Sequence, residues 1–203
     1  MNWHLQELWK RAIEKKDRIT GADVIITYEH HEVHAGSSFH VSYSVVTANT
    51  DDHVTAILFR TPKYGGLCHI IATFTASNPA EAIVNEAPTL GAPTAGSDKV
   101  VLNRNRNSAA ISSVQSLEAT PTVGSVTKAN ATEFGNITLS AGTELEHIYM
   151  AGGDGPQAVG GVNRGTQEWI LKNNTIYAFY LQNTGASANT HSISLDWYEH
   201  INK

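Results

Sequence analysis

The chain has 203 residues, of which 16 % are charged and 41 % are hydrophobic, and its formal net charge is −5. This length fits one medium-sized domain, and the apolar content argues against intrinsic disorder, which goes with few apolar residues and high net charge. A net negative charge excludes the broadly basic surface of a general nucleic-acid binder. No apolar run approaches the roughly 18 residues of a membrane span, so neither nucleic acid nor membrane is expected as a partner.

Residues 1–19 predict the clearest helix of the chain. Apolar residues recur there at three- and four-residue spacings, which places them on one helical face: Trp3, Leu5, Leu8, Trp9, Ala12 and Ile13. A helix of about 15 residues is marginal in water unless it docks on something. We therefore expect a short amphipathic helical arm, residues 1–20, before a β-domain, residues 21–203, with Trp3, Leu8 and Trp9 as interface residues.

The sequence pattern of the domain that follows predicts short strands separated by turns. In residues 39–46, Phe39, Val41 and Tyr43 alternate with polar residues, which predicts a strand with one buried face. The absence of recurrent helical segments predicts an all-β fold, an antiparallel β-sandwich or jelly roll. The other expected strands are 24–32, 53–60, 67–76, 99–103, 143–150, 168–171, 175–182 and 191–200, with a short helical turn at 81–85.

Two features of this domain concern its single cysteine and its connections. Cys68 cannot form an intrachain disulfide and lies in an apolar run, so we expect a buried thiol in a protein made in a reducing cytoplasm. Residues 86–96 and 151–165 read as long irregular connections, which are usually functional or face a partner. Residues 107–136 are either a pair of strands or an insertion that projects from the body.

The histidines near residue 30 are the main candidates for a metal site. On a strand, His30 and His34 would share one face and His31 the other. Imidazoles and nearby carboxylates hold zinc or iron in double-stranded β-helix enzymes of the cupin type. Those enzymes use a His-x-His pair with a glutamate and a distant third histidine, a frame that this stretch lacks. His30, His31 and His34 are therefore weak candidates, and polar surface histidines are the favoured interpretation.

Other chemical motifs are absent from the sequence. There is no Gly-x-Ser-x-Gly nucleophile elbow, and the glycine-rich residues 152–165 lack both the GxGxxG frame and the phosphate-binding lysine. Arg104 and Arg106 alternate with asparagines in residues 103–107. Guanidinium groups in such a setting recognise carboxylates at an interface or satisfy carbonyls at a strand end, so we expect a structural or intersubunit role for both arginines.

Several stretches together resemble virion structural proteins of tailed bacteriophages. They are TYEHHEVHAGSSFHV at 27–41, RTPKYGG at 60–66, NRNRNS at 103–108 and the long ending EWILKNNTIYAFYLQNTGASANTHSISLDWYEH at 168–200. The group includes capsid decoration, or cement, proteins with β-sandwich or jelly-roll bodies. The resemblance covers roughly residues 24–200, and its most specific pieces are 168–171 and 195–200.

The resemblance implies a non-enzymatic role without catalytic residues or cofactors. Such a protein is made in the cytoplasm of the host bacterium and binds the outer surface of the phage head. Its partners are the major capsid protein and itself, as a homodimer or homotrimer, and it stabilises the shell. One alternative is a tail or head-fibre component that binds host-surface glycan through exposed tryptophans. A less favoured alternative is a cupin-like metalloenzyme built on His30, His31 and His34.

Overall fold

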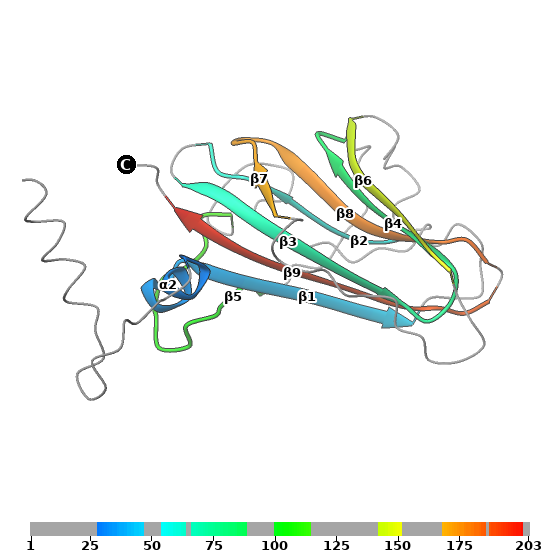
Figure 1. Cartoon of the computed structure of the whole chain (residues 1–203), viewed down its shortest axis with the longest axis horizontal. Coiled ribbons are helices and arrows are strands. Elements are labelled where there is room, and N and C mark those ends of the chain that lie inside the picture. The colour runs from blue at the N-terminus through cyan, green and yellow to red at the C-terminus, as the bar shows by residue number, and fades with distance from the viewer. Residues whose placement is uncertain are drawn as a thin grey trace, which may run out of the picture.

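The computed structural model describes residues 28–46, 54–63, 66–88, 100–114, 142–151, 168–185 and 187–200. This part of the chain forms two antiparallel β-sheets with one short helix beside them (Figure 1). The expectation of an all-β, sandwich-like fold is therefore confirmed. The expected helical arm, with Trp3, Leu8 and Trp9, lies outside the described residues. No helix in the described ranges is long and apolar enough to cross a membrane.

The strands agree closely with those expected from the sequence. Nearly every expected run after residue 38 coincides with a strand of the structure to within a few residues. The elements are α2 (Tyr28–Ala35), β1 (Ser38–Val46), β2 (Val54–Arg60), β3 (Leu67–Ala76), β4 (Ala80–Glu86), β5 (Leu102–Asn103), β6 (Thr143–Met150), β7 (Trp169–Leu171), β8 (Ile176–Asn183) and β9 (Thr190–His200).

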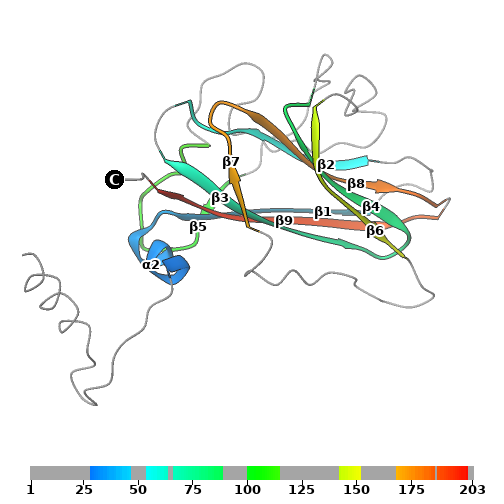
Figure 2. The ribbon, with the colours of Figure 1, turned by 45° about the horizontal axis from the view of Figure 1, so that its top comes forward.

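The first sheet has the strand order β5-β1-β9-β3-β7 and the second has the order β2-β8-β4-β6. In the first sheet β9 pairs along most of its length with both β1 and β3, for example Leu195 with Val41 and with Ala72. In the second sheet β8 has the same central place between β2 and β4. Helix α2 lies at the end of the first sheet where β1 begins and β9 ends (Figures 1 and 2).

Two expectations from local sequence were wrong. Residues 28–32 belong to α2 instead of the expected strand 24–32, whose first residues lie outside the described part. The helix ends in a Schellman motif: Gly36, at φ 77°, donates to the Val33 carbonyl, and Ser37 donates to the Glu32 carbonyl. Residues 81–85, expected as a helical turn, lie in β4. There, pairing with β6 and β8 overrides the weak local preference of Glu and Ala for helix.

The main core lies between the sheets and is rich in aromatic rings. Phe59 stacks on Phe179 and on Trp197, with ring centroids 5.5 and 6.2 Å apart. Trp197 is buried, and so is Cys68, as expected from the apolar run in which this cysteine lies. Burial, reinforced by the charge of Glu199, raises the pKa of the Cys68 thiol well above its ordinary value, so this cysteine is an unreactive core residue.

The two sheets differ on their outer faces. The outer face of the first sheet is largely polar, which is usual for an antiparallel sandwich. The second sheet instead carries another apolar cluster on its outer face, so that β2 and β8 are buried on both sides. The members of this cluster are Ala56, Leu58, Ile83, Ala178 and Tyr180, none more than 6 % exposed.

Candidate functional site

The three histidines expected as weak metal candidates lie on α2, not on a strand. His30 and His34, four residues apart, are both exposed, and their Nε2 atoms lie 2.8 Å apart. His31 Nδ1 lies 3.4 Å from Glu32 Oε1. In the described part of the chain, no group of three or more His, Cys, Asp or Glu residues is arranged to hold a metal ion. Within that part the helix brings two of the three imidazoles together but does not assemble a ligand set.

The asparagines of the NRNRN stretch shape the segment that follows β5. Asn103 Nδ2 donates to the carbonyls of Gly36 and Ala110, at 2.7 and 2.9 Å. Asn105 Nδ2 donates to the carbonyl of His34 at 3.1 Å, which ties the segment to the end of α2. Residues 107–114 thus lie against the body, with Val114 in the core, while residues 115–136 of the expected insertion lie outside the described residues.

The two arginines of this stretch face outward. Arg104 Nε lies 3.7 Å from Asp196 Oδ1, and Arg106 is exposed. Three large apolar residues of the same segment are also exposed: Val100 by 71 %, Leu102 by 42 % and Ile111 by 70 %. We call these five residues the β5 patch. Exposed apolar residues beside guanidinium groups are typical of a protein interface.

A group of imidazoles and carboxylates covers the outer face of the first sheet near α2. His69 of β3 pairs in register with Tyr198 of β9, and their side chains meet at 3.1 Å between Nδ1 and the hydroxyl. His69 Nδ1 also lies 3.7 Å from Glu168 Oε2, and the His200 ring lies 4.5 Å from the His69 ring. Burial, reinforced by His200 and opposed by Glu168, lowers the pKa of His69 below its ordinary value.

The rest of that face is a ladder of small hydroxyl side chains. Ser42, Ser194 and Thr73 are neighbours across three strands, and the next row repeats the pattern with Ser44, Ser192 and Thr75. Ser44 Oγ donates to Ser192 Oγ at 2.7 Å. The face is thus divided into an imidazole end beside α2 and a hydroxyl end further along the strands.

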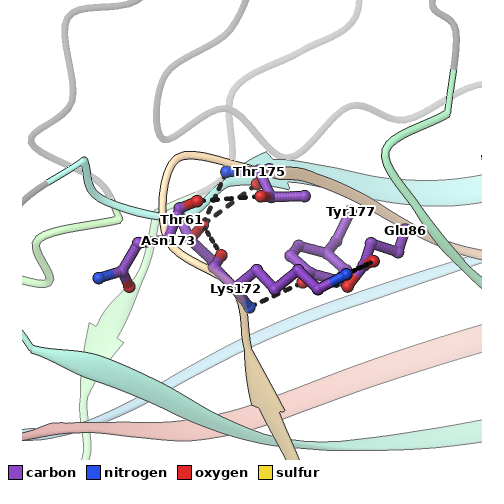
Figure 3. Close-up of polar contacts among 6 residues, drawn as sticks. All are labelled: Thr61, Glu86, Lys172, Asn173, Thr175 and Tyr177. Carbon is purple, nitrogen blue, oxygen red and sulfur yellow. Dashed lines mark hydrogen bonds and ion pairs between the residues drawn. The ribbon is translucent and has the colours of Figure 1, made fainter.

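The turn between β7 and β8 forms a rigid corner (Figure 3). The buried carboxylate of Glu86 accepts hydrogen bonds from Lys172 Nζ at 2.6 Å and from the Tyr177 hydroxyl at 2.7 Å. Tyr177 in turn accepts from the backbone N–H of Lys172 at 2.8 Å. Burial alone would raise the pKa of Glu86, but these hydrogen bonds and the charge of Lys172 lower it below its ordinary value.

Thr61 is hydrogen-bonded to both ends of the turn between β7 and β8. Its hydroxyl donates to the carbonyl of Lys172 at 2.5 Å and accepts from the backbone N–H of Thr175 at 3.0 Å. Asn174, at φ 53°, takes the left-handed conformation that the tight turn requires. A shallow depression of about 240 Å³ opens beside the turn, lined by Arg60, Ala87, Pro88, Asn174, Thr175 and Ile176.

This corner was not predicted from the sequence. The strands on either side of it, 168–171 and 175–182, were expected, but the partners of the turn are distant in the chain: Thr61 is 114 residues from Thr175, and Glu86 is 91 residues from Tyr177. Only the sheet pairing brings these residues together. The one local indication of the corner was Glu86, a glutamate at the end of an apolar run. A carboxylate buried there needs hydrogen-bond donors.

Comparison with known proteins gives no relative: no family model, no curated protein and no solved structure matches this chain.

Proposed function

We propose that this chain is a non-enzymatic virion structural protein, a capsid decoration protein that binds the outer surface of a phage head and stabilises the shell. The observation that carries the proposal is the β5 patch. Val100, Leu102 and Ile111 are exposed apolar residues on a segment that Asn103 and Asn105 tie to the carbonyls of Gly36 and His34. Such a surface suits docking on another protein, which in this proposal is the major capsid protein.

We further propose that the sandwich is a jelly roll. Without the two-residue β5, eight described strands remain, and they pair as β1 with β9, β2 with β8, β3 with β7 and β4 with β6. In chain order, the first of these eight strands therefore pairs with the last, the second with the seventh, the third with the sixth and the fourth with the fifth. These pairs alternate between the two sheets, as they do when one antiparallel ribbon is wrapped into two Greek keys. Jelly rolls form viral capsid and lectin domains as well as cupins, so this order is compatible with the proposed role but not specific to it.

The packing between the sheets supports a structural role over the cupin-like alternative. In a cupin the metal lies inside the barrel, among inward-pointing imidazoles. Here the described interior is filled by aromatic and aliphatic side chains, with Phe59, Phe179 and Trp197 stacked at its centre. Its buried histidine, His191, is bonded to Thr55 at 3.0 Å. A filled interior suits a structural protein, or one that binds its partners through its outer surface.

Binding to heads that were assembled without this chain tests the proposal. We expect the purified protein to co-sediment with such heads and to appear on their outer surface by electron microscopy. The variant Ile111→Asp should weaken binding at least tenfold, because it places a charge in an apolar contact. Tyr149→Asp is the matched control, since Tyr149 is 64 % exposed on β6, at an edge of the other sheet.

Four outcomes would contradict parts of the proposal. Absence of binding to heads removes the capsid role, and labelling at the tail or at fibres favours the glycan-binding alternative instead. Equal binding by Ile111→Asp and wild type removes the β5 patch from the contact. A strict monomer, both in sedimentation and on the particle, removes the homodimer or homotrimer.

A further inference from the structure

The depression at the β7–β8 corner has an arginine in its wall that the rest of the described chain does not use. Arg60 ends β2 on the outer face of the second sheet, where it pairs in register with Ile176. Its side chain is half-buried, and it makes no hydrogen bond or ion pair with any described residue. A guanidinium group stays charged at every physiological pH and has five N–H donors to satisfy. Its charge and donors therefore remain available to a ligand.

The charges around the depression favour an anion. Glu86 is the nearby carboxylate, but Lys172 and Tyr177 already bind its two oxygens. Lys172 compensates the charge of Glu86, and no carboxylate of the described residues is paired with Arg60. This local positive charge stands on a chain whose net charge is −5. An incoming carboxylate would meet a fork of donors in the bidentate geometry that arginine provides.

The size and the walls of the depression narrow the choice of ligand. A volume of about 240 Å³ holds one side chain or a group of similar size. Ala87, Pro88 and Ile176 offer apolar contact for methylene groups, and the side chain of Asn174, which makes no hydrogen bond within the described residues, offers an amide. None of the six described lining residues is aromatic, so these walls offer no ring face on which a sugar could stack. An acidic side chain fits these walls better than a sugar acid.

The corner is already held in the shape that binding needs. Asn174 N donates to the Pro62 carbonyl at 2.9 Å, and Ala87 N donates to the Ile176 carbonyl at 2.7 Å. Together with the bonds of Thr61 and Glu86, these contacts fix the strand ends that form the depression (Figure 3). A preformed site loses little conformational entropy when its ligand binds.

We propose that this depression is a binding site for an acidic side chain of a partner protein, with Arg60 as the residue that holds the carboxylate and Asn174 as a second donor. The site lies apart from the β5 patch and does not depend on the capsid role. It gives the protein a second, carboxylate-specific contact point at a corner of the sandwich.

A titration followed by two-dimensional NMR tests the proposal on the full chain. The probe is the peptide acetyl-Ala-Glu-Ala-amide, and acetyl-Ala-Gln-Ala-amide is its neutral control. We expect saturable shifts of the backbone amides of Asn174, Thr175 and Ile176 with the glutamate peptide only. Arg60→Gln should weaken binding at least tenfold, while Lys63→Gln, which removes an exposed cation three residues beyond the end of β2, should change it less than twofold.

A second variant keeps the test meaningful if Arg60→Gln alters the fold. Asn174→Gly removes the amide but retains the positive φ, which glycine adopts freely, and should weaken binding about threefold. Equal affinity for the two peptides, or unchanged binding by Arg60→Gln with a native spectrum, overturns the proposal. Binding of glucuronate without binding of the glutamate peptide overturns it as well and assigns the site to a sugar acid.

Discussion

Glu86 shows how one buried carboxylate organises its surroundings. Its oxygens are bonded by a lysine ammonium and a tyrosine hydroxyl that come from the start and the end of one turn. The same tyrosine accepts a backbone hydrogen bond, so Tyr177 links the carboxylate to the turn itself. Burial and the neighbouring Glu86 charge raise the pKa of Tyr177 well above its ordinary value, which keeps the hydroxyl proton on the donor at every physiological pH.

We expect Tyr177→Phe to destabilise the protein by about 1–3 kcal/mol, because it removes the donor to Glu86 Oε2 and the acceptor of the Lys172 backbone N–H. Urea unfolding followed by circular dichroism measures the change. Tyr149→Phe removes the same atom from a residue that is 64 % exposed and should change stability by less than about 0.5 kcal/mol. If both variants had equal stability, the network at the corner would have no energetic role.

At the scale of elements, Glu199 anchors the segment that follows β5. Near the end of β9 its carboxylate accepts from the backbone N–H of Ser113 at 2.9 Å and from Trp197 Nε1 at 3.0 Å, and also from the hydroxyls of Ser112 and Ser113. Ser112 is fully buried. One side chain thus closes this end of the sandwich over the core.

We expect Glu199→Ala to lower stability by about 2 kcal/mol and to release residues 104–114 from the body, because the hydrogen bonds to a charged acceptor are lost together. Brief trypsin digestion reads out the release, since Arg104 and Arg106 lie in the segment. Glu146→Ala, on the edge strand β6, is the control and should be cut no faster than wild type. Protection of both arginines in Glu199→Ala would show that the asparagine contacts alone hold the segment.

The elements also show what the sequence could and could not predict. Strands with strict alternation, such as β1 and β9, were placed almost to the residue because their period of two reflects one buried face. Helix α2 was not predicted, because its end is set by the backbone conformation of Gly36. Strand β4 was not predicted either, because its environment comes from β6 and β8, which are distant in the sequence. Likewise Arg104 could be singled out from its neighbours, whereas the depression around Arg60 needs Pro88 and Asn174 brought together by the sheet.

For the whole molecule, we expect stability to fall as the pH is lowered from 7 to 5. The pKa of His69 is lowered in the folded protein, so below about 6.5 the unfolded chain binds a proton that the folded chain resists. The contribution of His69 to stability is therefore complete above that pH and is lost as the pH falls. Glu32, Glu168, Tyr198 and His200 surround this imidazole and set the size of the effect.

Urea midpoints measured at pH 7.5, 6.5 and 5.5 test this expectation. His69→Gln should show a smaller loss than wild type over this range, because glutamine does not titrate. Thr143→Ser, at an exposed position on β6, is the control and should retain the wild-type slope, because it changes no ionisable group. An identical slope in all three proteins would mean that other groups govern the acid response. A further, separate loss is expected below about pH 4.3, where this glutamate binds a proton in the unfolded chain but resists it in the folded protein, because the pKa of Glu86 is lowered there.

The central place of β9 in the first sheet affects how the chain folds. β9 pairs with β1 and with β3, yet it is the last of the described strands to be synthesised. Until it leaves the ribosome, the edges that β1 and β3 offer to it have no partner. Pairing between such distant segments makes folding slow, on the order of milliseconds to seconds once β9 is available. During that interval the chain exposes unpaired strand edges, which favour aggregation.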